Sequence, residues 1–216
     1  MKFFTELSFS YVDIVVLAAL TFGVFQGRKR GLSGELLNVL KWIAIVGVGG
    51  ITYLPVAQYV RGYFPSLTPL AGNITVYVGL GLILALLFGA IQRSLGERLS
   101  GSDAFGAAEF YFGMMAGVVR VACVLVAAMS LINAREYSRV EVQAREKAQE
   151  ENFGSIRFFR WYSVQSDVFE GSLTGRAVKT YLAPLLISPV SPGGSQPNKS
   201  KSKRDGGKRF NEVLDP

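Results

Sequence analysis

The feature that most restricts the fold of this chain is a long apolar run near its middle. Residues 110–132 contain no charged side chain except Arg120. At a rise of roughly 1.5 Å per residue, a helix of this length crosses the apolar core of a bilayer. A charged side chain at mid-span is costly in lipid and usually faces protein or water. The run therefore predicts a transmembrane helix that packs inside a bundle.

Three further apolar runs predict three further membrane helices. Residues 11–26 carry no charge apart from Asp13, residues 36–54 carry one charge, and residues 74–91 carry none. Half of the residues in the chain are hydrophobic, which is more than a water-soluble domain of 216 residues needs. The sequence therefore predicts an all-α integral membrane protein with four transmembrane helices, which occupy residues 1–134.

A cleaved signal peptide is the alternative interpretation of residues 11–26. The charge of Lys2 is offset by Glu6, and no small-residue cleavage site follows before the basic residues 28–30. We therefore expect this first helix to be retained.

The chain changes character after the fourth helix. Residues 135–151 mix charges of both signs and predict a solvated helix, whereas residues 153–169 mix aromatic rings with arginines and suit the membrane surface, a partner interface or packing on the bundle. We expect residues 135–187 to form charged and amphipathic helices at the interface, including one over residues 173–186. Residues 188–216 are rich in Pro, Gly, Ser and Lys and predict a disordered basic tail.

Small residues recur one helical turn apart in the first and fourth predicted helices. Gly23 and Gly27 lie in the first, and Gly113 and Gly117 in the fourth. Because such pairs let two helix backbones approach closely, we expect these two helices to pack through them.

Two charges in the apolar runs predict an ion pair. Asp13 and Arg120 each cost free energy in lipid, and together they compensate each other. Glu35 is the competing partner, but we expect it at the opposite membrane face from Asp13. Lys41 is expected to extend its stem toward the headgroups.

The residue inventory argues against an enzyme. Among 216 residues there is no histidine, and Cys123 is the only cysteine. This removes Ser/His and Cys/His catalysis and imidazole metal sites. We predict no catalytic residue, no metal site and no cofactor.

Several short motifs occur in a fixed order along the apolar region. They are Asp13 at the start of the first helix, Gly27 with Arg30, Gly31 and Glu35 after it, the turn that contains Ser102 and Asp103, and the stretch from Gly113 to Arg120. In this order the chain resembles the colicin V production protein (CvpA) family over residues 11–133. It departs from the family pattern at Glu109 and Val121. Ser102 or Asp103 is also well placed to cap the fourth helix.

The resemblance implies a multi-pass bacterial inner-membrane protein without known catalytic activity. It implies an accessory or scaffold role in toxin or peptide production or export and in envelope homeostasis. A small channel or transporter subunit is the alternative, because Asp13, Lys41 and Arg120 lie within apolar runs. The expected partners are membrane lipids and a membrane or envelope protein, or a second copy of the chain. Nucleic-acid binding by the basic tail is not expected.

The charge distribution also predicts an orientation. The net charge is +7, and much of it lies in the tail. Short loops decide orientation, and the compact cluster Arg28, Lys29 and Arg30 favours a cytoplasmic first loop. Both termini would then lie outside the cytoplasm.

Overall fold

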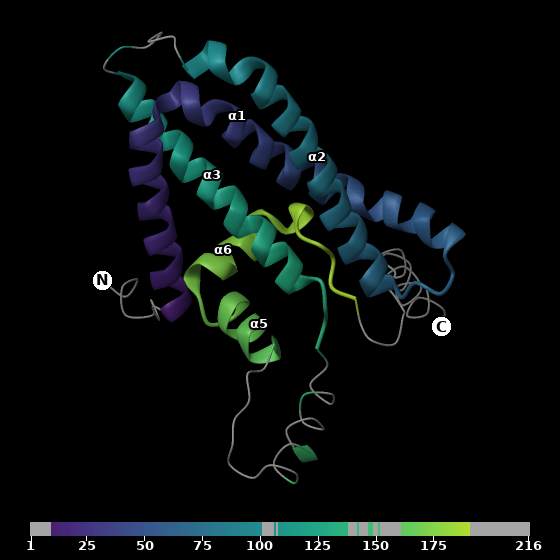
Figure 1. Ribbon diagram of the computed structural model, residues 1–216. Coiled ribbons are helices and arrows are strands. Elements are labelled where there is room, and N and C mark those ends of the chain that lie inside the picture. The colour runs from purple at the N-terminus through teal and green to yellow at the C-terminus, as the bar shows by residue number, and fades with distance from the viewer. Residues whose placement is uncertain are drawn as a thin grey trace, which may run out of the picture.

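The protein is a bundle of long helices with shorter helices beside one half of it (Figure 1). This computed structural model describes residues 10–100, 106, 108–137, 142, 147–148, 151 and 161–190, with the backbone alone for residues 95–100 and 161. The helices are α1 (Tyr11–Tyr63), α2 (Pro69–Ser100), α3 (Ala108–Asn133), α5 (Trp161–Phe169), α6 (Leu173–Tyr181) and the 3-10 turn η1 (Ala183–Leu185). Apart from an isolated bridge between Arg135 and Val190, no described residue pairs as in a sheet.

The longest helix, α1, contains both of the first two predicted apolar helices. It has 53 residues and one bend, at Gly31, whose φ of 68° and ψ of 174° are not helical. The positive φ favours glycine because it has no Cβ. At this bend the chain turns back toward the other end of the bundle (Figure 1). The two apolar runs are thus joined by a bend of one residue, with the basic residues 28–30 inside the helix.

The prediction that the second helix ends before Pro55 is wrong. Helix α1 continues through Pro55 to Tyr63, and only residues 64–68 connect it to α2. Proline removes one backbone hydrogen bond, but an open loop in an apolar environment would leave several backbone groups unpaired. The continued helix keeps those other bonds.

Helices α2 and α3 fill the remaining apolar runs. Helix α2 begins at Pro69, where a missing N–H costs no helical bond, and extends to Ser100, so residues 92–100 are helical rather than part of the expected turn. Helix α3 covers the run around Arg120. By length and composition, three helices are able to span a membrane, namely α1, the Pro69–Ser94 part of α2, and α3.

The outward faces of these helices are apolar. On α2, for example, Leu82, Ile83, Leu86 and Leu87 are all exposed. In Figure 1 the part of α1 after the bend lies between α2 and α3, and α1 packs on both helices. Exposed aliphatic rows on every long helix are what a bundle surrounded by lipid requires.

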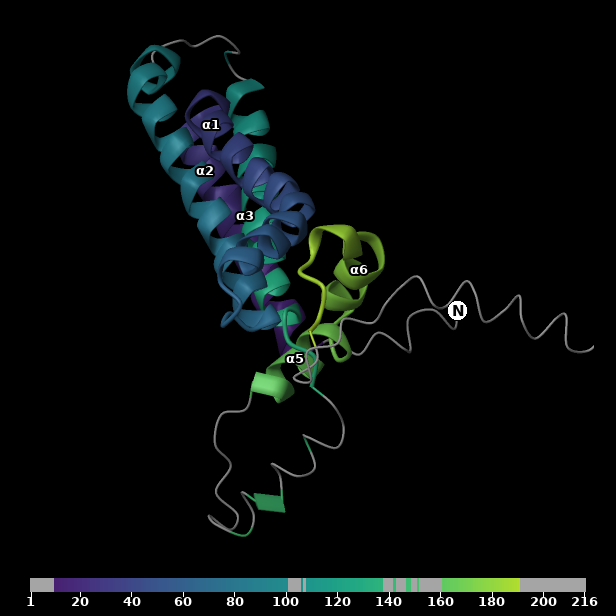
Figure 2. The same ribbon diagram turned by 90° about the vertical axis from the view of Figure 1, so that its right-hand side faces the viewer.

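Helices α5 and α6 lie beside the half of the bundle that is remote from the bend in α1 (Figure 2). Side chains of α5 and α6 share an apolar cluster with α1 and α3, including Val16, Val126, Val168, Phe169 and Val178. The amphipathic helix predicted over residues 173–186 stops at Tyr181 and is followed by η1, which contains Pro184. Proline cannot continue the helical hydrogen-bond ladder, which accounts for the early end.

Several sequence predictions fall partly or wholly outside the described residues. They include most of the solvated helix at 135–151, the aromatic stretch before Trp161 and the tail beyond Val190. Residues 188–190, which the sequence assigned to the tail, are described, and Val190 is buried against the bundle. The ordered chain therefore extends further than composition indicated.

Candidate functional site

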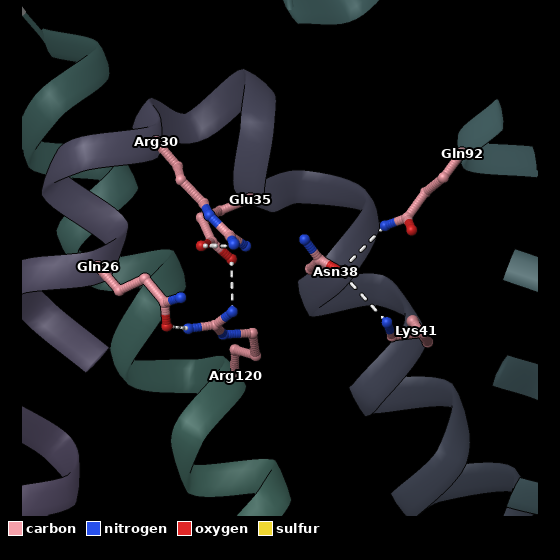
Figure 3. A network of polar contacts seen from close by, with 7 residues as sticks. All are labelled: Gln26, Arg30, Glu35, Asn38, Lys41, Gln92 and Arg120. Carbon is pink, nitrogen blue, oxygen red and sulfur yellow. Dashed lines mark hydrogen bonds and ion pairs between the residues drawn. The ribbon is translucent and has the colours of Figure 1, made fainter. Parts of the chain in front are cut away.

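A cluster of charged and amide side chains lies inside the bundle next to the bend in α1 (Figure 3). Arg120 of α3 lies with its Nη1 3.5 Å from Oε2 of Glu35, and Nη1 of Arg30 lies 3.4 Å from the other oxygen, Oε1. Arg120 also donates from Nη2 to Oε1 of Gln26. Gln26 and Glu35 come from opposite sides of the bend, so the bend itself assembles the cluster around Arg120.

Burial differs sharply among the charges of this cluster. The Glu35 side chain is 0% exposed, that of Arg120 12% and that of Arg30 46%. The ion-pair distances exceed the 2.7–2.9 Å typical of tight charge-assisted bonds, and Oε2 of Glu35 has no hydrogen-bond donor in the described structure. One buried carboxylate thus faces two guanidinium groups. It compensates Arg120 by proximity rather than by a close fork of hydrogen bonds.

The predicted pair between Asp13 and Arg120 is wrong. Arg120 pairs with Glu35, the partner that the sequence ranked second. The reason is the bend at Gly31, which brings Glu35 back beside the first half of α1 within reach of the Arg120 side chain. Arg120 therefore extends toward the bend and away from Asp13.

Asp13 instead binds the beginning of α6. Its carboxylate accepts hydrogen bonds from the backbone N–H of Leu173 at 3.1 Å and of Thr174 at 3.0 Å, and from the Thr174 hydroxyl at 2.7 Å. It also accepts from the N–H of Ser10 at 3.2 Å, which caps α1. A carboxylate is favourable at a helix N-terminus because the N–H groups there lack helical partners and carry partial positive charge. Asp13 thus joins the start of α1 to the C-terminal helices.

A second polar group links α1 to α2 (Figure 3). Oδ1 of Asn38 accepts from Nζ of Lys41 at 3.2 Å and from Nε2 of Gln92 at 3.0 Å. Lys41 therefore has a protein partner, where the sequence predicted an extension to the headgroups. Gln26 and Gln92 were not predicted as site residues, although a glutamine within or beside an apolar run was a usable signal.

The four predicted packing glycines lie in direct contact between the first half of α1 and α3. A Cβ added at Gly23 would lie 2.8 Å from the carbonyl oxygen of Gly117, and one at Gly113 would lie 2.6 Å from that of Gly27. Real Cβ atoms do not approach backbone oxygens so closely, so any side chain here would push the helices apart. The contact holds α1 near enough to α3 for Gln26 to reach Arg120.

The family-motif residues separate into two sets. Arg30, Gly31 and Glu35 lie at the bend or in the charged cluster, whereas Ser102 and Asp103 lie outside the described residues. Among the residues described, no group of three or more His, Cys, Asp or Glu side chains is placed to hold a metal ion. The arrangement can hold helices together through buried charge.

Comparison with known proteins identifies the family. Residues 12–149, well over half of the chain, match the family described as colicin V production protein. Neither the search of curated proteins nor that of solved structures found a match. The match covers the bend, the packing glycines and the charged cluster, and it confirms the family that the motifs indicated. The chain belongs to the colicin V production protein family.

Proposed function

We propose that this chain is a non-enzymatic, multi-pass protein of the bacterial inner membrane. We assign it an accessory or scaffold role in the production or export of a toxin or peptide and in envelope homeostasis. The family match supports the link to toxin production. The observation that carries the scaffold role is that two buried charges hold elements together: Arg120 of α3 pairs with Glu35 of α1, and Asp13 of α1 binds the start of α6.

The engaged charges support a scaffold more than a conducting path. Asp13 binds α6, Lys41 binds Asn38 of its own helix, and Arg120 binds Glu35 and Gln26. Ion paths need polar groups that exchange partners along a route. Here Asp13 lies near the start of α1 and the cluster around Arg120 lies beside the bend, and each has partners of its own.

Four membrane crossings fit this proposal best. A straight helix of 53 residues would be about 80 Å long, against a hydrocarbon core of about 30 Å. The bend at Gly31 divides α1 into residues 11–30 and 32–63, each long enough to cross. With α2 and α3, these two halves give four crossings and place the start of α1 and the end of α3 on one side.

A small channel or transporter subunit is the alternative function. It is favoured by Glu35, a fully buried carboxylate whose Oε2 has no hydrogen-bond donor in the described structure. Such an oxygen can accept a proton, and proton relays in transporters use buried carboxylates.

Two measurements test the proposed function. In a strain that secretes a peptide toxin, deletion of this gene should lower toxin release, and the wild-type chain should restore it. In liposomes that contain a pH-sensitive dye, the wild-type protein should pass no protons under either gradient, and Glu35→Gln should match it. If the wild-type protein passes protons and Glu35→Gln abolishes this flux, the transporter-subunit function would replace the scaffold function as the proposal. Normal toxin release without the gene would remove the role in export.

A further inference from the structure

The last described part of the chain lies extended along the surface of the bundle. After η1 the backbone becomes extended at Leu186, with φ of −84° and ψ of 147°. Leu186, Ile187 and Val190 are buried, whereas Ser188 and Pro189 are exposed. We call residues 186–190 the resident segment. Its apolar side chains face the bundle while its polar and proline positions face outward, so it lies at the surface of the helices.

Side chains of α1 and α3 bind the backbone of the resident segment. Ser130 Oγ accepts from the N–H of Ile187 at 2.9 Å, and Asn133 Nδ2 donates to the carbonyl of Ile187 at 2.9 Å. The Tyr53 hydroxyl accepts from the N–H of Ser188 at 2.7 Å. Since these bonds involve main-chain atoms, they recognise an extended backbone whatever its side chains are.

The backbone after α3 adds two more main-chain bonds. Val190 donates its N–H to the carbonyl of Ala134 at 3.0 Å and accepts from the N–H of Glu136 at 3.2 Å. This short parallel pairing continues the recognition to the end of the described chain. Main-chain bonds of this kind give affinity to bound extended peptides, and here the buried side chains of Leu186, Ile187 and Val190 add apolar contact.

A glycine on α1 makes room for the backbone immediately before the resident segment, at the end of η1. A Cβ added at Gly50 would lie 2.6 Å from the carbonyl oxygen of Leu185 and 2.9 Å from its Cα. Gly50, Tyr53, Ser130 and Asn133 together define what we call the peptide groove. With the segment in place Ser130 is 0% and Asn133 8% exposed, so the segment covers these two polar side chains and also supplies hydrogen-bond partners to them.

The groove and its occupant differ in origin. All four groove residues fall within the family match, residues 12–149, and the resident segment lies beyond it. The family region therefore carries a groove that reads an extended backbone, and the occupant comes from a part of the chain that the match does not include.

We propose that the peptide groove is a binding site for an extended, aliphatic segment of a partner protein. Residues 186–190 fill the groove in the free protein as a tethered competitor. The partner segment presents buried aliphatic side chains at the positions of Leu186, Ile187 and Val190 and free N–H groups at the positions of Ile187 and Ser188. This inference deepens the proposed function and rests on it for the source of the partner, a component of toxin production or export.

The test measures binding of a capped synthetic peptide with the sequence of residues 185–190 to the full-length protein in lipid nanodiscs. The variant Ile187→Asp weakens the resident segment and leaves the groove intact. It should bind the peptide at least about tenfold more tightly than the wild type, because a tethered competitor acts at millimolar effective concentration. In the wild type, excess peptide should accelerate hydrogen exchange of the amides of Leu186, Ile187, Ser188 and Val190 severalfold and leave those of α5 unchanged.

Two matched controls separate groove binding from partition into lipid. A peptide N-methylated at the positions of Ile187 and Ser188 keeps every side chain but loses the donors to Ser130 and Tyr53, so it should not bind. Adding Gly50→Leu to Ile187→Asp should block the groove and abolish binding. Equal binding of the methylated peptide, or binding that survives Gly50→Leu, would overturn the proposal. Hydrogen exchange that stays unchanged when peptide is added to the wild type would also overturn the proposal, and this measurement does not depend on the folding of any variant. Because no assay here involves toxin release, failure of the groove is distinguishable from failure of the scaffold role.

Discussion

At the scale of single residues, Glu35 matters most for the electrostatics of the bundle, because its carboxylate is fully buried beside a guanidinium group. It is the only described acidic side chain that pairs with Arg120, and it is fully buried. A buried ion pair stabilises the fold in comparison with a single unpaired charge at the same place. The family-motif glutamate is therefore best understood through the arginine it compensates.

The first prediction is that Glu35 and Arg120 depend on each other. Glu35→Leu and Arg120→Leu should each lower the free energy of unfolding by about 3–5 kcal/mol, because each strands a buried charge. The double variant should lose less than the sum, with a coupling of about 1–3 kcal/mol. Denaturant titration in mild detergent measures all three. Arg30→Ala, which removes a half-exposed partner, should cost less than about 1 kcal/mol.

The matched control for this cycle is Asp13→Asn combined with Arg120→Leu. The carboxylate of Asp13 binds Leu173 and Thr174, so these two changes should be additive. Additive losses for Glu35 and Arg120, together with coupling between Asp13 and Arg120, would contradict the observed arrangement.

At the scale of helices, the contact between α1 and α3 depends on the absence of side chains. Gly23, Gly27, Gly113 and Gly117 let the two backbones touch, and the polar contact from Gln26 to Arg120 lies within the same approach. Dispersion between closely packed backbones replaces the hydrophobic effect, which lipid does not supply between helices.

The second prediction concerns this glycine contact. Gly27→Ala and Gly117→Ala should each lower the melting temperature in detergent by several degrees, because the new methyl group meets a backbone carbonyl. Gly79→Ala on α2 is the control, since nothing lies within 4 Å of a Cβ there. It should leave the melting temperature equal or raise it slightly through better helix propensity. Equal effects at all three positions would mean that close approach contributes nothing.

The third prediction concerns the cap on α6. Asp13→Asn removes the negative charge and one of two acceptor oxygens, so hydrogen exchange of the first α6 amides should accelerate about tenfold or more. Thr174→Val removes only the hydroxyl donor and should have a smaller effect. Exchange in α3 should not change in either variant. An α6 that stays equally protected in Asp13→Asn would show that apolar packing alone docks it.

The sequence predicts those features of the fold and the site that depend on residues close together along the chain. The apolar runs and the glycine spacing are local, and they indicated α3, the middle of α2 and the four contact glycines. Pairing of charges is not local. A one-residue bend brings Glu35 back beside the first half of α1, whereas a loop between two helices would not fix its position in this way. A sequence with many glycines does not reveal which one has a positive φ, so the bend at Gly31 could not be predicted. The same holds for Asp13, whose partners lie beyond position 170.

At the scale of the whole molecule, the helices have two unlike ends. The bend carries Arg28, Lys29 and Arg30, all exposed, whereas the start of α1, the end of α3 and the helices α5 and α6 gather at the other end (Figure 1). The basic end favours the cytoplasm under the positive-inside rule.

The fourth prediction is that this basic end faces the cytoplasm. In a Cys123→Ala background, single cysteines at Gly62 and Ser94, both exposed and near opposite ends of the bundle, serve as a matched pair. A membrane-impermeant maleimide added to cells with a permeabilised outer membrane should label Gly62→Cys and spare Ser94→Cys. Labelling of Ser94→Cys alone would invert the orientation.

The bonds from Asp13 to α6 also bear on how the protein is made. The bond from Thr174 to Asp13 joins residues 161 positions apart, so α1 is synthesised well before the helix that supplies its partners. Until then its carboxylate lies at an apolar surface without those three donors. A chain released early therefore differs from a finished one at its very beginning. In an incomplete copy, the carboxylate near the start of α1 still lacks the donors that α6 supplies in the finished protein.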